Sequence, residues 1–348
     1  MSQPIGLVDL ARRHAAHAQE IESRVLEVLR SGRYIGGPVV AELERKVAQR
    51  MGQAHGVGVG SGTDGLSLAL QAVGVQAGDE VIVPAMSFIA TAGAVLQLGA
   101  TPVVVDVQQD RPLMDAAAAE AAITDRSRAV VPVHLFGSGC ALPEVAVPVV
   151  VDAAQAMGAD PALPCGDVAV LSFYPTKVLG GAGDGGMVLT HDAALCERVR
   201  GLANHGGPDH AYPGSNSRLD ALQAAVLLAH LDVLDDRLER RRRIAAALDE
   251  ASGGRALPRD PGSPVTVWAL RHPERAGLAA ALQAEGIQTR VYYPQPLSSV
   301  PAMQGRCRTM GPLSHAIALC QEVLAVPCHA DLRDDEVHRI TGVLEAWQ

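Results

Sequence analysis

Short apolar runs alternate with helical stretches through the first two-thirds of this chain. We expect strands at about 57–60, 81–83, 102–106, 129–133, 147–151 and 186–190, with helices between most of them. Such an alternation favours an α/β fold with a mostly parallel sheet. With 348 residues and 48% hydrophobic content, the chain can build a full core and more than one domain.

A long helical stretch from Arg218 to Glu250 follows these elements. It is longer than a typical globular helix and is either one helix or two joined helices. The segment 251–264 is a loop rich in glycine and proline, and a helix near 275–285 follows it. We therefore expect a large domain over residues 1–230, with its N-terminal helix, and a smaller C-terminal α/β domain over 231–348.

Lys177 lies in a turn between two apolar runs, in the segment VAVLSFYPTKVLGGAGDGGMVLT (Val168–Thr190). Ser172 precedes it by five residues, and a glycine-rich stretch follows it. Desolvation of a lysine held between strands lowers its pKa, so that a neutral amine can attack a carbonyl carbon. Enzymes that use pyridoxal phosphate (PLP) need that amine and a hydroxyl for the cofactor's phosphate. The alternative is a surface lysine in a glycine-rich loop.

Asp152 ends the expected buried strand Val147–Val151, and Gln155 follows it by three residues. The carboxyl ends of parallel strands face the crevice in which α/β proteins bind ligands. A carboxylate paired with a pyridine nitrogen keeps that ring protonated, which makes PLP an electron sink. Small Ala153 and Ala154 leave room for a flat ring. Asp152 alone is also explained as a helix cap. Its occurrence together with the lysine favours the PLP site.

A glycine-rich turn, SGTDG (Ser61–Gly65), joins the first expected strand to an apolar helix. Free N–H groups and the helix dipole at such a junction favour a phosphate. Gly60 and the two glycines of the turn also satisfy GxGxxG, which suggests a dinucleotide fold. That fold requires an acidic residue at the end of the next strand, whereas Asp79 and Glu80 precede the strand Val81–Val83. We therefore rank a nicotinamide oxidoreductase below a PLP enzyme.

Composition excludes several other classes of partner. The formal net charge of −9 argues against nucleic acid as the main partner. No apolar stretch is long enough to span a bilayer, and the N-terminus lacks the pattern of a signal peptide. The six cysteines have no CxxC spacing, which indicates reduced thiols rather than disulfides or a zinc site. We expect a cytoplasmic protein with no metal, nucleic-acid or membrane partner.

Motifs along nearly the whole chain resemble the DegT/DnrJ/StrS family of sugar aminotransferases, which are fold type I PLP enzymes. The motifs that carry the resemblance are RSGRYIGGPVVAELE, SGTDGLSLAL, AGDEVIVPAMSFIATA, GATPVVVDV, AVVPVHLFG, VVDAAQAMGA, SFYPTKVLGGAGDGG, NSRLDALQAA and VYYPQPL. The resemblance implies a mostly parallel sheet of the seven-stranded type flanked by helices, with a smaller C-terminal α/β domain. It also implies a homodimer with shared active sites.

The resemblance assigns roles to single residues. Lys177 would form the internal aldimine with PLP, and Asp152 would pair with the pyridine nitrogen; these two are the candidate catalytic residues. Phe88 and Ala154 would cover the two faces of the ring. The whole candidate set for the cofactor is Gly62, Thr63, Asp64 (through its backbone), Phe88, Asp152, Ala154, Gln155, Ser172, Lys177 and, from the partner subunit, Asn216.

By the same resemblance, the chain makes an amino-sugar from a nucleotide-linked keto-sugar, with L-glutamate as amino donor and 2-oxoglutarate as co-product. Its motifs are most similar to members that act on 3-keto sugars, and Arg218 and Tyr293 are the candidate substrate contacts. A 4-keto sugar or a cyclitol ketone is the rival substrate, and a non-catalytic PLP-binding regulator is the rival class. A sugar dehydratase on the same fold carries histidine in place of Lys177, which disfavours that activity.

The chain departs from the family pattern at several places. The segments 137–151 and 156–171 are shorter than usual. Tyr292 stands where histidine is frequent, and Val178 where asparagine is common. These departures spare the cofactor set, so they bear on the sugar pocket and on the identity of the substrate.

Overall fold

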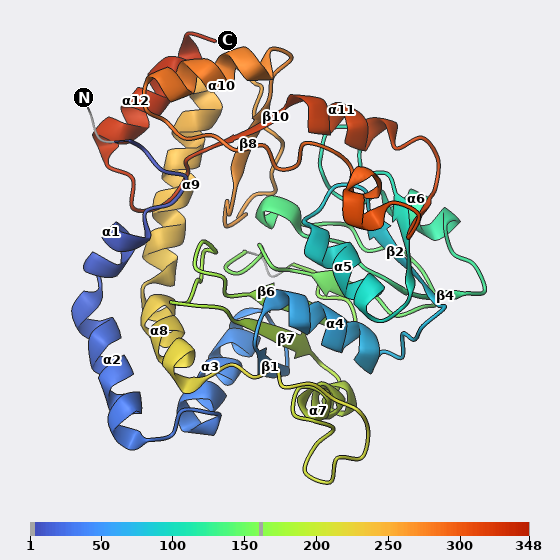
Figure 1. Ribbon diagram of the computed structural model, residues 1–348. Helices are drawn as coiled ribbons and strands as arrows, with labels where there is room; N and C mark the ends of the chain where they lie inside the picture. The colour runs from blue at the N-terminus through green and yellow to red at the C-terminus, as the bar shows by residue number, and fades with distance from the viewer. Residues whose placement is uncertain (1–3, 160–162, 348) are drawn as a thin grey trace.

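A computed structural model describes residues 4–159 and 163–347 (Figure 1). Within these residues, one sheet has the strand order β1-β7-β6-β5 and another has the order β4-β2-β3-β9. Parallel bridges from Val130 to Val149 and from Val133 to Asp152 join the two along β4 and β5. The strands are β1 His55–Val59, β2 Glu80–Pro84, β3 Thr101–Val105, β4 Ser127–Val130, β5 Val150–Asp152, β6 Val168–Ser172, β7 Gly186–Thr190 and β9 Arg308–Thr309.

The sheet is mostly parallel, as the sequence predicts. Among the strands of residues 4–159 and 163–347 that form it, only β7 runs antiparallel to its neighbours, β1 and β6. The pairs β2–β3, β2–β4, β3–β9 and β5–β6 are parallel. Two expected strands have other bounds: β4 ends at Val130 rather than at 133, and β5 begins at Val150 rather than at 147. Pro132 and Pro148 explain both differences, because proline has no N–H to donate to a strand ladder.

Helices cover both faces of the sheet (Figure 1). They are α1 Leu10–Ala15, α2 Ala18–Ser31, α3 Gly37–Arg50, α4 Gly62–Ala72, α5 Ile89–Gln97, α6 Ala116–Ala121, α7 Ala193–Leu202, α8 Ala221–Asp232, α9 Leu234–Ala251, α10 Arg275–Ala284, α11 Ser314–Glu322 and α12 Asp334–Glu345. The long stretch in the sequence is therefore two helices, which meet at Val233. Between β4 and β5 the chain forms only the short 3₁₀ turn Leu135–Gly137, consistent with an interval too short for a crossover helix.

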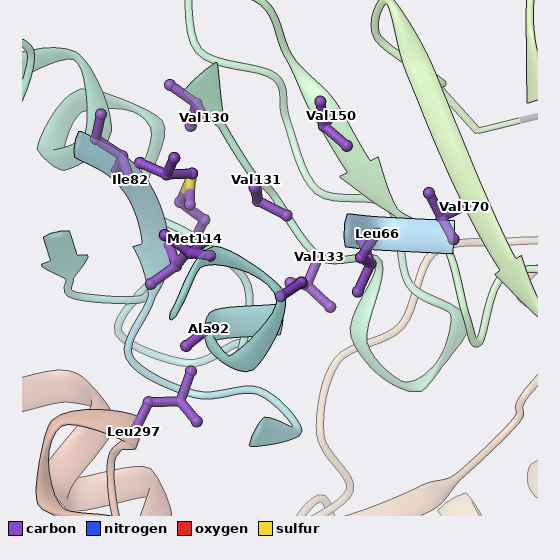
Figure 2. Close-up of a cluster of buried hydrophobic side chains, with 14 of the residues drawn as sticks. Leu66, Ile82, Ala92, Met114, Val130, Val131, Val133, Val150, Val170 and Leu297 are labelled. Carbon is purple, nitrogen blue, oxygen red and sulfur yellow. The ribbon is translucent and has the colours of Figure 1, made fainter. Parts of the chain in front are cut away.

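Alternate residues of β6 enter two different hydrophobic clusters. Val168 and Val170 pack with α4 in the first cluster, which Figure 2 shows in part around Leu66 and Ile82. Ala169 and Leu171 pack with α3 and α8 in the second cluster. This alternation follows from the two-residue period of a strand. The sheet is therefore packed between two layers of helices, and a site can form at the carboxyl ends of its strands.

The C-terminal part adds a second small sheet, in which β8 Trp268–Arg271 pairs antiparallel with β10 Val323–Val326. A third cluster gathers apolar residues from Ile244 to Leu344 together with Ile5. Helix α9 extends from α8 toward α10 and α12 (Figure 1). Leu297 and Met303, from two further 3₁₀ turns, pack instead on the first cluster. The division at residue 230 stays a prediction.

Other features concern possible partners. In the part of the chain that the structure describes, no helix has the length and apolar character needed to cross a membrane. The six cysteines are unpaired, and five of them are buried. Residues 4–159 and 163–347 contain no group of three or more His, Cys, Asp or Glu side chains that could hold a metal ion.

Candidate active site

A cavity of about 550 Å³ lies where β5 and β6 end. Asp152 and Ser172, the last residues of these strands, line it together with the first residues of α4. Leu7 lines it from the N-terminal segment, and Trp268 from β8. Widely separated parts of the chain therefore meet around one space, at the strand ends where α/β sheets bind ligands.

Most of the sequence-predicted site residues line this cavity. They are Gly62, Thr63, Phe88, Asp152, Ala154, Gln155, Ser172, Lys177 and Tyr293. Three others, Asp64, Asn216 and Arg218, are not among the lining residues of the single chain. The structure thus brings the lysine and the aspartate together, although 25 positions separate them in the sequence.

Lys177 follows β6 in a tight loop, and its N–H donates to the Tyr174 carbonyl at 2.8 Å. Burial lowers the pKa of the Lys177 amine, and the negative charge of Asp152 opposes that shift. Among the described residues, Lys177 Nζ has no hydrogen-bond partner. Both observations fit an amine that reacts in its neutral form rather than a lysine that serves a salt bridge.

Asp152 is 5% exposed, and its two oxygens have separate donors. Thr91 Oγ1 donates to Oδ2 at 2.7 Å, and the Ala154 N–H donates to Oδ1 at 3.1 Å. Burial raises the pKa of Asp152, whereas these hydrogen bonds and the charge of Lys177 stabilise its ionised form. No helix begins at residues 153–159, so the alternative of a helix cap is wrong. The two hydrogen bonds therefore fix the orientation of a carboxylate that lines the cavity.

Gln155 lines the cavity, and both of its oxygens accept hydrogen bonds. Its Oε1 accepts from the Phe136 N–H, and its main-chain carbonyl accepts from Thr266 Oγ1 at 2.6 Å. Within the described residues, Gln155 Nε2 has no partner. The side chain is thereby oriented with its two N–H donors free for a ligand oxygen.

The first turn of α4 forms a site suited to an anion. Ser61 caps the helix, and its Oγ accepts from the Asp64 N–H at 3.1 Å. The N–H of Asp64 is therefore already used, which weakens its predicted contact with phosphate. The amides of Gly62 and Thr63 have no partner within the helix, because the first N–H groups of any helix lack one. A Cβ on Gly62 would lie 2.8 Å from the Cβ of Ser172, so only glycine permits this approach.

The segment between α7 and α8 projects at the bottom of Figure 1. Asn216 and Arg218 lie in its last part, where Ser217 N–H donates back to the Ala203 carbonyl at 3.0 Å. Both are exposed. Asn216 pairs with Asn204 through a backbone bridge, and Arg218 Nη1 donates to Asn204 Oδ1 at 2.6 Å. The loop is thus ordered outside the cavity of its own chain. Its action in a partner's site stays a prediction.

Sequence reasoning missed several residues of the site. Thr91 does not line the cavity but donates to Asp152; it stands one helical turn after Phe88, so its position was a possible signal. Thr266 and Arg290 gave none, because they come from the distant C-terminal part. Arg290 is exposed and forms no ion pair among the described residues. The rings of Phe88 and Tyr293 lie 6.5 Å apart at their centroids, so both can face the same ligand.

Comparison with known proteins gives one consistent result. The model of the DegT/DnrJ/EryC1/StrS aminotransferase family matches residues 15–345. A pleiotropic regulatory protein of Geobacillus stearothermophilus is 38% identical over 354 residues, which cover 95% of each chain. The UDP-N-acetyl-3-dehydro-α-D-glucosamine 3-aminotransferase of Acidithiobacillus ferrooxidans is 40% identical over 359 residues, covering 98% of this chain and 97% of that protein. The crystal structure of S. venezuelae DesV with a ketimine intermediate has a TM-score of 0.93 and 36% identity, and each chain is 99% covered.

Proposed function

The chain belongs to the DegT/DnrJ/EryC1/StrS aminotransferase family, and on this premise we propose that it uses PLP to transfer the amino group of L-glutamate to a nucleotide-linked 3-keto sugar. The observation that carries the proposal is the pairing of Lys177 and Asp152 in one cavity. The amine has no partner among the described residues, and the carboxylate is held by Thr91. An ordinary structural ion pair would not leave the amine unbonded.

The cavity residues fit PLP by their donors and shapes. When bound, PLP supplies an aldehyde that condenses with amines and a protonated ring that accepts an electron pair. Asp152 would hold the proton on the ring nitrogen, and Gln155 Nε2 would donate to the ring hydroxyl. The amides of Gly62 and Thr63 and the hydroxyl of Ser172 would bind the phosphate. Glycine at position 62 leaves room for this cradle, since a Cβ there would reach β6.

Lys177 has two tasks in this proposal. Its neutral amine would condense with the cofactor's aldehyde, with loss of water, and an amino donor would later displace it. The released Nζ would carry the proton from the donor's α-carbon toward the cofactor, and in the reverse direction to the sugar carbon that receives the amino group. Burial favours both tasks because it lowers the pKa of the amine and so disfavours its charged form.

A nucleotide-linked 3-keto sugar is the substrate that several observations support. The relative from Acidithiobacillus ferrooxidans is named for a UDP-linked 3-dehydro sugar. The cavity volume of about 550 Å³ lies in the usual range for small-molecule sites. Tyr293 lines this space beside Phe88 and is a substrate contact in our proposal. A 4-keto sugar or a cyclitol ketone remains the alternative substrate.

We propose further that two chains form a homodimer with shared active sites. Phe88, a cavity residue, is 56% exposed, and Tyr34, Ile35 and Tyr174 are also large exposed apolar side chains. Asn216 and Arg218 are exposed and lie outside the cavity of their own chain. A second copy would cover these apolar groups, and Asn216 would reach the cofactor's phosphate there while Arg218 meets the sugar nucleotide.

A non-catalytic, PLP-binding regulator is the second candidate, because one relative is named a pleiotropic regulatory protein. The two candidates differ in one spectroscopic test. We expect the purified protein with PLP to show the visible absorbance of a lysine-bound cofactor. L-glutamate should abolish that band and 2-oxoglutarate should restore it. A band that glutamate leaves unchanged would support the regulator, and no band at all would refute the role of Lys177. Screening 3-keto against 4-keto nucleotide sugars then tests the substrate.

A further inference from the structure

Two neighbouring arginines of α1 bind different parts of the protein. Arg12 donates to the Asp331 carbonyl at 2.6 Å and to the Glu336 carboxylate at 2.8 Å. Arg13, which is 6% exposed, extends its side chain to the loop that carries Lys177. Helix α1 therefore links the C-terminal segment to the lysine loop.

The Arg13 guanidinium donates to several main-chain carbonyls around Lys177. Nη1 lies 3.2 Å from the Pro175 oxygen and 3.1 Å from the Lys177 oxygen. Nη2 lies 3.0 Å from the Val178 oxygen and 3.5 Å from the Gly180 oxygen. A guanidinium is a rigid planar fork with five N–H donors, so one side chain can fix several acceptors at once. These acceptors come from both sides of the lysine and from the lysine itself.

His230 of α8 supports the same contacts. Its Nδ1 lies 2.8 Å from the Gly180 oxygen and 3.3 Å from Arg13 Nη2. Burial, followed by the positive charge of Arg13, lowers the pKa of His230 to about 4. The imidazole is therefore neutral near pH 7. With its hydrogen on Nδ1 it donates to the Gly180 oxygen, so it accepts no hydrogen bond from Arg13 and acts with Arg13 through the carbonyl that both contact. Burial also lowers the pKa of Arg13, to about 10, which leaves the guanidinium protonated at that pH.

Burying the charged Arg13 side chain in this way costs free energy, which a purely structural contact does not require. Arg13 forms no ion pair with a carboxylate among the described residues, and a buried charge without such a partner is expensive. The loop itself is tight, because a Cβ on Gly180 would lie within 2.4 Å of the Pro175 oxygen. The guanidinium fixes the main chain at the residue whose side-chain amine must reach the cofactor. Placement of Nζ is thus the property that this contact controls most directly.

We propose that Arg13, supported by His230, is a positioning residue that holds the Lys177 loop so that Nζ stays within reach of the cofactor's aldehyde. The proposal rests on the proposed function, in which Lys177 bonds to PLP. It assigns Arg13 no contact with cofactor or substrate, because Arg13 is absent from the residues that line the cavity.

The test separates covalent capture of the cofactor from non-covalent binding. The protein without cofactor is mixed with PLP, and bonding to Lys177 with loss of water is followed by absorbance. Borohydride reduction and peptide mass then identify the modified lysine. Pyridoxamine phosphate has no aldehyde, so its dissociation constant reports the cavity without the lysine bond. The variants are Arg13→Met and Arg13→Lys, with Arg12→Met as the matched control on the same helix.

We expect Arg13→Met to slow capture about 10- to 100-fold, the effect of misplacing a reacting group by about 1 Å. Its affinity for pyridoxamine phosphate should change less than about threefold, and Arg12→Met should capture PLP at the wild-type rate. Arg13→Lys should fall between Arg13→Met and the wild type, because an ammonium group cannot match the planar fork.

Three results would overturn the proposal: unchanged capture in Arg13→Met, equal slowing in Arg12→Met, or an affinity for pyridoxamine phosphate that falls as far as the capture rate. If Arg13→Met does not fold, the same comparison in Arg13→Lys decides. A wild-type protein that binds pyridoxamine phosphate but never modifies Lys177 would refute the proposed function itself, and this assignment with it.

Discussion

Replacing Thr91 with valine keeps the side-chain shape and removes one hydroxyl from the candidate site. That hydroxyl donates to Asp152 Oδ2 at 2.7 Å, and both residues are buried. A hydrogen bond to a charged group contributes about 1.5–3 kcal/mol. Without it the ionised carboxylate is less stable, so the pKa of Asp152 rises further above its usual range. The carboxylate then takes the proton from the ring nitrogen in a larger fraction of molecules.

The expected loss of rate follows from that free energy. Each 1.36 kcal/mol is tenfold in rate, so Thr91→Val should slow the half-reaction with L-glutamate about 10- to 100-fold. The assay is stopped-flow absorbance of the cofactor across pH. Asp152 acts in its ionised form and loses it as the pH falls. Because the variant's pKa is higher, activity should be lost at a higher pH than in the wild type.

A matched control removes a buried threonine hydroxyl far from the cavity. Thr190 Oγ1 donates to the Asp167 carbonyl at 2.8 Å. Thr190→Val should lower the free energy of unfolding by about 1 kcal/mol and leave the pH profile in place. If Thr91→Val is folded and its rate and acid limb match the wild type, the hydrogen bond does not tune Asp152 and the reasoning is refuted.

Three further outcomes follow from the same structure. Lys177→Ala and Asn216→Ala should each be inactive, and mixing them should restore part of the activity in heterodimers; no recovery after verified subunit exchange would contradict the shared site. Gly62→Ala places a Cβ against β6, so calorimetry should detect a loss of about 1–3 kcal/mol, together with weaker binding of pyridoxamine phosphate. Although burial opposes its ionisation, the neighbouring His329 and the two hydrogen bonds from Arg237 lower the pKa of Asp331. The lowered pKa means that ionised Asp331 stabilises the folded protein. This contribution to the free energy of unfolding is present above the unfolded pKa of about 3.9 and is lost as the pH falls. Asp331→Asn should therefore lower the free energy of unfolding by about 3 kcal/mol at pH 7 and make it depend less on pH in acid. Denaturation curves that match the wild type at both pH values would contradict this.

Local sequence patterns determined much of the fold and the centre of the site. Apolar runs of strand length placed β2, β3 and β7, whereas the break of the long helical stretch at Val233 came only from the structure. The order of Asp152 and Lys177 predicted their meeting, because both follow strands whose carboxyl ends lie at the same edge of a sheet. These features depend on residues close together in the chain, so the sequence displays them directly.

Tertiary structure alone decided what holds these two groups in place. Thr91 reaches Asp152 across 61 positions, Thr266 reaches Gln155 across 111, and Arg13 reaches the lysine loop across more than 160. No periodicity or spacing links such residues, since the chain must first fold before one can donate to the other. A hydrogen bond between distant segments depends on how they pack, so it cannot be predicted from the pattern of residues along the chain.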